Sequence, residues 1–152
     1  MAVQLTRRQT LWSAGALVAL GAAGGVPRPA RAANDAQERL MDFTGGIEPQ
    51  MGRVMLDMPE IAENGNTVPM HVRVDSPMSA DDHVVEVMIL ADGNPSSAVA
   101  TFQFSPLAGV AEANTRIRLG GTQNVMAVAK MSDGSFHMAT HEVRVTIGGC
   151  GG

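Results

Sequence analysis

Seven short runs of β-branched or alternating residues, separated by turn-forming residues, constrain the fold of this chain more than any other feature. In the last run, Val143, Val145 and Ile147 alternate with polar residues, which is the period of a strand with one buried face. Strands separated by turns about every 8 to 12 residues are typical of a β-sandwich. We therefore predict an all-β, immunoglobulin-like antiparallel sandwich. Its strands are expected at residues 53–57, 68–75, 84–91, 98–104, 113–119, 124–131 and 136–147.

A short helix is expected before the first strand. Asn34 is of the residue type that caps helix N-termini, and Gln37 stands three positions later. Gly45 and Gly46 follow the helical run and predict its end.

Three local features refine the sandwich. Asp133 and Gly134 lie between the last two strands and predict a hairpin with a primed turn. Pro69 has no N–H to donate to a neighbouring strand, which predicts that its strand begins at a sheet edge. Residues 84–90 are apolar on both faces, so we expect another subunit to cover one side of this strand.

The N-terminal residues have the pattern of an export signal. Arg7 and Arg8 precede an apolar run over residues 11–26, and residues 30–32 form an A-x-A cleavage pattern. We expect residues 1–32 to be a twin-arginine-type signal peptide and the mature protein to be periplasmic. Export by the Sec route and retention of the segment as an anchor are the alternatives.

Charge excludes one class of partner. The whole sequence has a net charge of −4, and the expected signal peptide contains four arginines and no acid, so its removal takes the net charge to −8. A protein this acidic lacks the basic face that sequence-independent nucleic-acid binding requires. The remaining residues are expected to form a helix and sandwich domain at 33–147 and a separate C-terminal segment at 148–152.

That C-terminal segment holds the chain's single cysteine. Cys150 lies between Gly148-Gly149 and Gly151-Gly152, directly after the last predicted strand. A single cysteine has no intrachain disulfide partner, so in an exported protein it is either a free reactive thiol or a link to another chain, such as a disulfide-linked dimer. Glycines on both sides predict a slim, flexible arm that reaches at most about 17 Å. We therefore predict a carrier arm that takes a thiol-bound group into the active site of another protein.

The same residues resemble the SoxY family, the sulfur-carrier subunits of the periplasmic Sox sulfur-oxidation system. The resemblance rests on the terminal Gly-Gly-Cys-Gly-Gly and covers the whole mature chain as well as the type of leader. Other matching stretches are residues 61–69, 76–78, 82–84, 115–119 and 131–136.

The resemblance implies a function and a set of partners. It implies that Cys150 is the covalent attachment site for inorganic sulfur, that the SoxZ subunit forms a heterodimer with the chain, and that the chain has neither a cofactor nor catalytic residues of its own. It also implies transient contacts with a c-type cytochrome that couples thiosulfate to the thiol, a manganese hydrolase that releases sulfate, and a sulfane dehydrogenase.

Other functions were weighed against this one. Ubiquitin-like sulfur carriers also end in Gly-Gly, but they act in the cytoplasm and lack a leader. Ten mature methionines, four histidines and the cysteine suggest a periplasmic copper-binding protein. His137 and His141 share one face of a predicted strand, but four residues separate them by about 13 Å, which is too far for one ion. His71 and His83 are expected to be ordinary strand-face or turn residues. An independent enzyme is disfavoured because a flexible thiol has no fixed base or oxyanion donor beside it.

Overall fold

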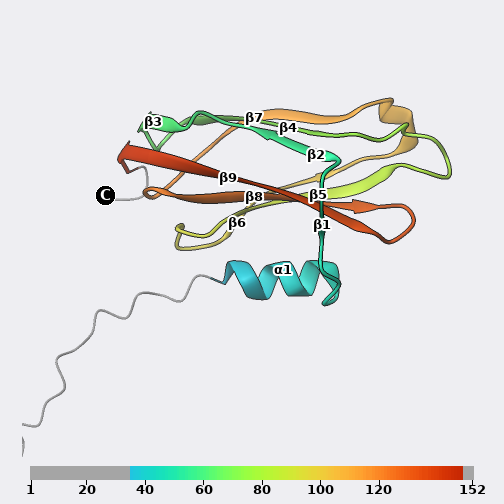
Figure 1. Ribbon diagram of the computed structural model, residues 1–152. Helices are drawn as coiled ribbons and strands as arrows, with labels where there is room; N and C mark the ends of the chain where they lie inside the picture. The colour runs from blue at the N-terminus through green and yellow to red at the C-terminus, as the bar shows by residue number, and fades with distance from the viewer. Residues whose placement is uncertain (1–34, 149–152) are drawn as a thin grey trace, which may run out of the picture. The chain divides into compact units, whose positions relative to one another are not determined.

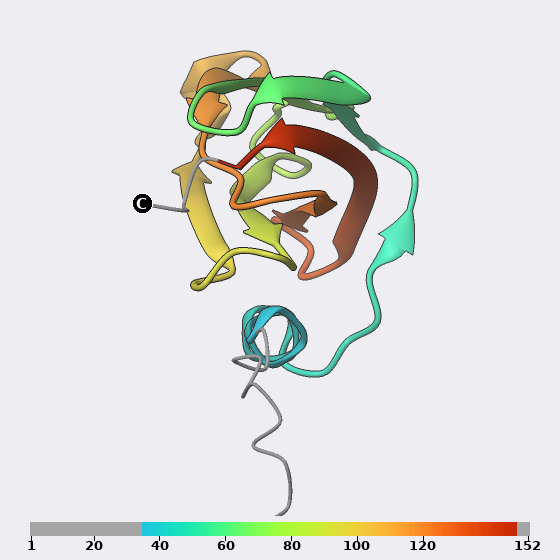
Figure 2. The same cartoon turned by 90° about the vertical axis from the view of Figure 1, so that its left-hand side faces the viewer.

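The computed structural model describes residues 35–148, and these residues form a β-sandwich with one α-helix beneath it (Figures 1 and 2). The predicted fold class is confirmed. The signal peptide predicted at residues 1–32 and the residues Gly149 to Gly152 lie outside the described residues. The elements are α1 (Ala36–Thr44), β1 (Gln50–Met51), β2 (Val54–Asp57), β3 (Ile61–Asn64), β4 (Val68–Val74), β5 (Val84–Ala91), β6 (Ala98–Gln103), the 3₁₀ turn η1 (Pro106–Ala108), β7 (Ala111–Ile117), β8 (Gln123–Met131) and β9 (Phe136–Ile147).

Two sheets make up the sandwich. One has the strand order β1-β9-β8-β5-β6, with β3 also paired to β9, and the other has the order β2-β4-β7. Five of the seven pairings are antiparallel, but β1 and β3 both run parallel to β9. The expectation of a wholly antiparallel sandwich was wrong in this respect. The two short strands had not been expected, because two and four residues are too few for a period to be read.

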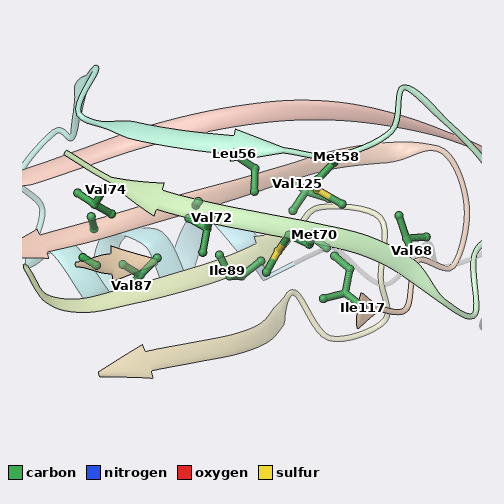
Figure 3. Close-up of a cluster of buried hydrophobic side chains, with 14 of the residues drawn as sticks. Leu56, Met58, Val68, Met70, Val72, Val74, Val87, Ile89, Ile117 and Val125 are labelled. Carbon is green, nitrogen blue, oxygen red and sulfur yellow. The ribbon is translucent and has the colours of Figure 1, made fainter. Parts of the chain in front are cut away.

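The core lies between the sheets, and the alternation seen in the sequence is what builds it. In β4 every second residue is buried, from Val68 through Met70 and Val72 to Val74, while Pro69 and Arg73 are exposed. Figure 3 shows these side chains meeting Val87 and Ile89 of β5 across the gap between the sheets. Each fully buried valine or isoleucine contributes about 1.5–3 kcal/mol relative to an exposed one. The core therefore consists almost entirely of aliphatic and methionine side chains.

Helix α1 covers the outer face of the larger sheet. Leu40 packs in a second apolar cluster with Leu90 of β5, Val128 of β8 and Phe136 of β9, and Phe43 makes an edge-on contact with Phe136 at 5.8 Å. The outward face of β5 is thus buried within the chain, with Leu90 fully inaccessible. The expectation that another subunit covers this strand was wrong, because the helix supplies the missing apolar surface.

The ends of the helix agree only in part with the prediction. Gly45 adopts a left-handed conformation at the C-cap, as its position after the helical run predicts. The N-cap is Asp35, so the predicted capping pair of Asn34, which lies outside the described residues, and Gln37 was wrong. The Asp35 carboxylate accepts a 2.6 Å hydrogen bond from Arg39 Nε and a 3.1 Å bond from the backbone N–H of Ser97. The side chain of Ser97, then that of Arg39 and the Ser97 backbone, hold the pKa of Asp35 well below its ordinary value.

The turn and the proline also differ from expectation. Strands β8 and β9 form the predicted hairpin, but Gly134 N–H donates to Met131 carbonyl, and Gly134 alone has a positive φ, of 83°. This is a type I turn followed by a left-handed glycine, rather than a primed turn. Strand β4 is central rather than an edge, but β2 pairs only with residues 71–74. Pro69 therefore sits where β4 has no neighbour on that side, so its missing N–H costs little.

Candidate functional site

The C-terminal end of β9 is the described part of the chain nearest to Cys150, and it is clamped by backbone hydrogen bonds. Strand β3 runs alongside it, with Asn64 level with Ile147. The N–H of Gly65 donates to the carbonyl of Ile147 at 2.7 Å, and the carbonyl of Gly65 accepts the N–H of Leu119 at 2.8 Å. The last strand residue is therefore fixed to two other segments of the chain.

Gly148 follows the strand and packs against the backbone of Gly120. A Cβ atom at Gly148 would lie 2.5 Å from the Gly120 carbonyl oxygen, closer than two such atoms can approach. Only glycine fits here without a shift of the neighbouring backbone. The sequence places Gly148 among the residues of the flexible arm, but the structure gives it a close contact. The other predicted arm residues, Gly149, Cys150, Gly151 and Gly152, lie outside the described residues.

A polar network holds the loop that carries Gly120. The amide oxygen of Asn94 accepts the Gly120 N–H at 2.8 Å and a Gln123 side-chain N–H at 3.0 Å. The Asn94 side-chain nitrogen donates to the Arg118 carbonyl at 2.9 Å, and the Gln123 amide oxygen accepts the Gly93 N–H at 2.8 Å. Because Asn94 ties both sides of the loop, the surface that Gly148 touches is rigidly placed. In Figure 1 this loop, from β7 to β8, crosses between the sheets at the end of the sandwich where β9 ends.

Sequence analysis did not identify this network. Asn94 and Gly120 read as ordinary turn residues, and nothing in the spacing of 94, 120 and 148 indicates that they meet. Strand β7 was also expected to run to Leu119, whereas it ends at Ile117 because the Arg118 carbonyl and the Leu119 N–H bond to side-chain and loop atoms instead. The paired glycines at 120 and 121 were the one available signal of a close backbone approach.

A groove lies beside this loop, between the edge strands of the two sheets. It is lined by Asn94, by residues 98–100 of β6 and by residues 115–118 at the end of β7. Two exposed arginines, Arg116 and Arg118, are among its lining residues. In the described pairings β6 contacts only β5 and β7 contacts only β4, so both strands have an open edge.

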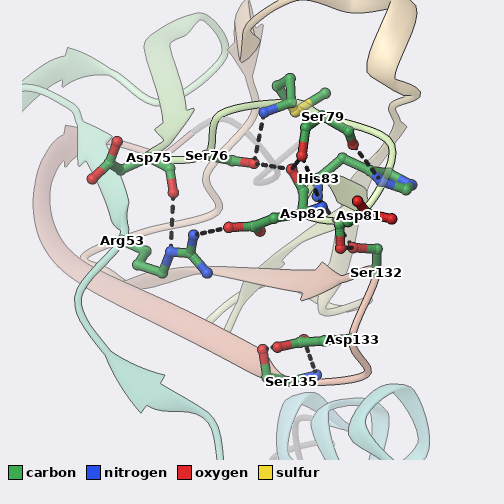
Figure 4. A network of polar contacts seen from close by, with 11 residues as sticks. Arg53, Asp75, Ser76, Ser79, Asp81, Asp82, His83, Ser132, Asp133 and Ser135 are labelled. Carbon is green, nitrogen blue, oxygen red and sulfur yellow. Dashed lines mark hydrogen bonds and ion pairs between the residues drawn. The ribbon is translucent and has the colours of Figure 1, made fainter.

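The opposite end of the sandwich is closed by side chains (Figure 4). Arg53 Nη2 lies 3.0 Å from Asp82 Oδ2, and Arg53 Nε donates to the Asp75 carbonyl at 3.1 Å. The hairpin nearby is held by Ser135, whose hydroxyl and N–H both donate to Asp133 Oδ1, at 2.6 and 2.8 Å. These bonds, the hydroxyl first, hold the pKa of Asp133 below its ordinary value. We interpret this end as structural.

The histidines do not assemble into a metal centre. His71 Nε2 of β4 lies 3.9 Å from Glu112 Oε2, His83 lies in the turn before β5, and His137 and His141 lie on β9. Across residues 35–148, no group of three or more His, Cys, Asp or Glu side chains could hold a metal ion. Within the same residues, no helix is long and apolar enough to span a membrane.

Comparison with known proteins identifies one family. The profile of the family described as "Sulfur oxidation protein SoxY" matches residues 40–150. Among solved structures, the sulfur carrier protein SoxY from Chlorobium limicola f thiosulfatophilum is 28% identical, with a TM-score of 0.60, over 71% of this chain and 89% of that chain. No curated protein sequence matches the chain.

More distant structural neighbours share the fold alone. A superoxide reductase (neelaredoxin) from Ignicoccus hospitalis has a TM-score of 0.55 and 15% identity, over 73% of this chain and 90% of that one. A putative superoxide reductase from Thermotoga maritima has a TM-score of 0.52 and 17% identity, over 68% of this chain and 90% of that one. At such identities the likeness concerns the sandwich, and function must be argued from the site.

Proposed function

The chain belongs to the SoxY family of sulfur oxidation proteins, and from this we propose that it carries sulfur intermediates bound covalently to the thiol of Cys150. Its role in sulfur oxidation is that of a carrier, as in the SoxY from Chlorobium limicola f thiosulfatophilum. The proposal goes further, because it names the attachment atom and the way in which the cargo is presented to other proteins.

One observation carries the proposal. The family match extends to residue 150 and so includes the cysteine, beyond the end of the sandwich. The described chain reaches this point in a favourable geometry, because Ile147 and Gly148 are both exposed. Gly148 is held against Gly120 at a fixed place on the sandwich. A thiol two residues further on stands outside the core, where an enzyme can reach it.

The proposed chemistry begins with loading. The Cys150 thiolate and thiosulfate form a new S–S bond and give up two electrons, which a c-type cytochrome partner accepts. The product is a cysteine S-thiosulfonate, –S–S–SO₃⁻. Since a thiolate is the reactive form of cysteine, activation of the thiol is assigned to the active site of the partner.

Unloading then proceeds on the same sulfur atom. A hydrolase that uses manganese adds water to the terminal sulfonate, which leaves as sulfate with two protons and leaves a persulfide. A sulfane dehydrogenase removes six electrons from that outer sulfur, with three waters supplying the oxygens, and forms a sulfonate. A second hydrolysis releases sulfate and restores the thiolate. In this cycle the chain presents the cargo, and its partners supply the catalysis.

The proposal includes a location and a partner subunit. Residues 1–32 serve as a twin-arginine-type signal that sends the protein to the periplasm, and SoxZ forms the heterodimer. Both follow from the leader pattern and the family, and both are open to direct measurement by the mature N-terminal sequence and by co-purification.

Intact mass spectrometry tests the proposal. The exported protein is reduced and then incubated with thiosulfate and its oxidising cytochrome partner. We expect an S₂O₃ adduct on the peptide containing Cys150, removed by reductant and absent from Cys150→Ser. A thiol that stays unmodified while the cytochrome turns over, or an adduct that persists in Cys150→Ser, would refute the assignment.

A further inference from the structure

The groove between β6 and β7 begins within two residues of the contact that fixes the base of the C-terminal segment. Gly148 touches Gly120, whose N–H bonds to Asn94, and Asn94 in turn lines the groove and holds the carbonyl of Arg118. Two residues beyond Gly148 span at most about 7 Å between Cα atoms. The Cys150 side chain and a sulfur adduct on it extend this reach further. A group on that sulfur can therefore enter the groove without any change in the sandwich.

The groove has the charge and the donors that a sulfonate requires. Arg116 and Arg118 both line it, and neither is in an ion pair among the described residues. The one side-chain contact given for Arg116 is a 3.5 Å contact from Nη1 to the hydroxyl of Thr67. Arginine donors suit the oxygens of sulfonate-like anions, and the open edges of β6 and β7 add backbone N–H groups. Unpaired arginines at this point stand out in a chain whose net charge is −4.

We infer that the groove is a resting site for the loaded segment Gly149–Gly152, in which Arg116 and Arg118 bind the anionic sulfonate end of the cargo on Cys150. The inference rests on the proposed function, because it needs a sulfonate-bearing adduct on that cysteine. The uncharged thiol has no such attraction, so loading itself favours the folded-back position. While docked, the cargo is shielded from small thiols in solution, and it is released when an enzyme offers a stronger anion site.

The test starts by loading the exported chain, with any subunit that co-purifies, using tetrathionate. The Cys150 thiolate attacks a central sulfur, the central S–S bond breaks, and thiosulfate leaves with the electron pair. The cysteine retains –S–SO₃⁻, so no separate oxidant is needed. Intact mass confirms loading before anything else is measured. If the thiol cannot be loaded, the proposed carrier function fails; if it is loaded, the resting site is tested separately.

Backbone amide NMR then locates the cargo. On loading, we expect shifts at Asn94, Thr115 and Arg118, and none in Cys150→Ser treated in the same way. Free thiosulfate at the protein's own concentration should leave these resonances unchanged, because docking depends on the high local concentration that the tether provides. Shifts confined to Ile147 and Gly148, or equal shifts with the free anion, would overturn the inference.

Release kinetics supply a second readout. With dithiothreitol as the attacking thiol, the adduct should be lost about two- to fivefold faster from the Arg116→Gln/Arg118→Gln double variant, the range for exposed charge pairs. Arg73→Gln is the matched control, since Arg73 lies on the same sheet but pairs with Glu112 at the far end of β4. Its release rate should equal that of the parent chain, and the effect of the double variant should shrink in high salt. Equal rates for all three proteins would overturn the inference.

Discussion

The two ends of this sandwich are closed by different means. The end at the β8–β9 hairpin is joined by side chains: Arg53 bonds to Asp82 and to the Asp75 carbonyl, and Ser135 bonds to Asp133. The end at Ile147 is joined mainly through backbone atoms, with Gly65 bonded on both sides. β9 has 12 residues, so the two ends lie about 40 Å apart.

The difference matters for a carrier. Charged side chains that bridge an end occupy the space around it, whereas backbone hydrogen bonds and a glycine contact fix a strand while leaving its surroundings open. At the Ile147 end the single close contact, from Gly148 to Gly120, replaces a side chain altogether. The chain is thus firmly placed up to residue 148 and sterically unobstructed there, which is what presentation of a thiol requires.

The largest effect is expected from Leu119→Ala. Leu119 is fully buried at the Ile147 end, and its N–H bonds to Gly65. Loss of its side chain should destabilise the protein by about 2–5 kcal/mol, because a buried cavity remains. Urea unfolding followed by far-UV circular dichroism measures this. Leu107→Ala, at a position that is 98% exposed, is the control and should change stability by less than about 0.5 kcal/mol. Similar values for both variants would mean that backbone bonds alone hold this end.

Gly148→Ala should have the next largest effect. The added Cβ would overlap the Gly120 carbonyl, and the backbone shift that relieves this should cost about 1–3 kcal/mol. It should also redirect the segment that follows, so the rate of enzymatic unloading should fall by more than the stability loss explains. Amide NMR at Ile147 and the unloading rate with partner enzymes provide the two readouts.

Gly121→Ala is the matched control for that variant. Gly121 lies in the same loop, and a Cβ there would meet no atom within 4 Å. Both stability and unloading should remain close to those of the parent. If the two alanine variants behave alike, the Gly148 contact does not position the arm.

The same contrast explains what sequence could predict. Period-two alternation identifies β4 and β9, because a strand between core and solvent must alternate, and Val72 and Val143 are buried as expected. The position of Cys150 and its glycines led to the SoxY family, which the family match confirms. Chemistry that depends on residue type and local order is therefore readable from the chain.

Contacts between distant segments were not readable. Asn94, Gly120 and Gly148 meet because the sheets bring them together, and their spacing in sequence carries no trace of this. For the same reason, the apolar outer face of β5 suggested a partner subunit, whereas α1 covers it from the start of the described chain. A pattern shows that a surface must be covered, but it does not show which segment covers it.

Arg53→Gln tests the side-chain end with a smaller expected effect. The Arg53 and Asp82 side chains are 32% and 45% exposed, so water screens their attraction. We expect a loss of about 1 kcal/mol, with a coupling of about 0.2–1 kcal/mol in a double-mutant cycle with Asp82→Asn. Loading of Cys150 should be unaffected, because the pair lies at the far end of the sandwich. A change in loading would show that the two ends are coupled.

The smallest effect concerns acid stability at the hairpin. Hydrogen bonds from Ser135 hold the pKa of Asp133 below its ordinary value of 3.8. A carboxyl with a lowered pKa in the folded state contributes stability that is fully present above the unfolded value and is lost as the pH falls through the folded one. Asp133→Asn should therefore flatten the stability profile below about pH 4 while leaving neutral stability almost unchanged. Some acid dependence should remain, because Asp35 also has a lowered pKa. Thermal unfolding between pH 2 and pH 7 measures the profile, and an unaltered acid slope in Asp133→Asn would show that this hairpin contributes nothing to acid stability.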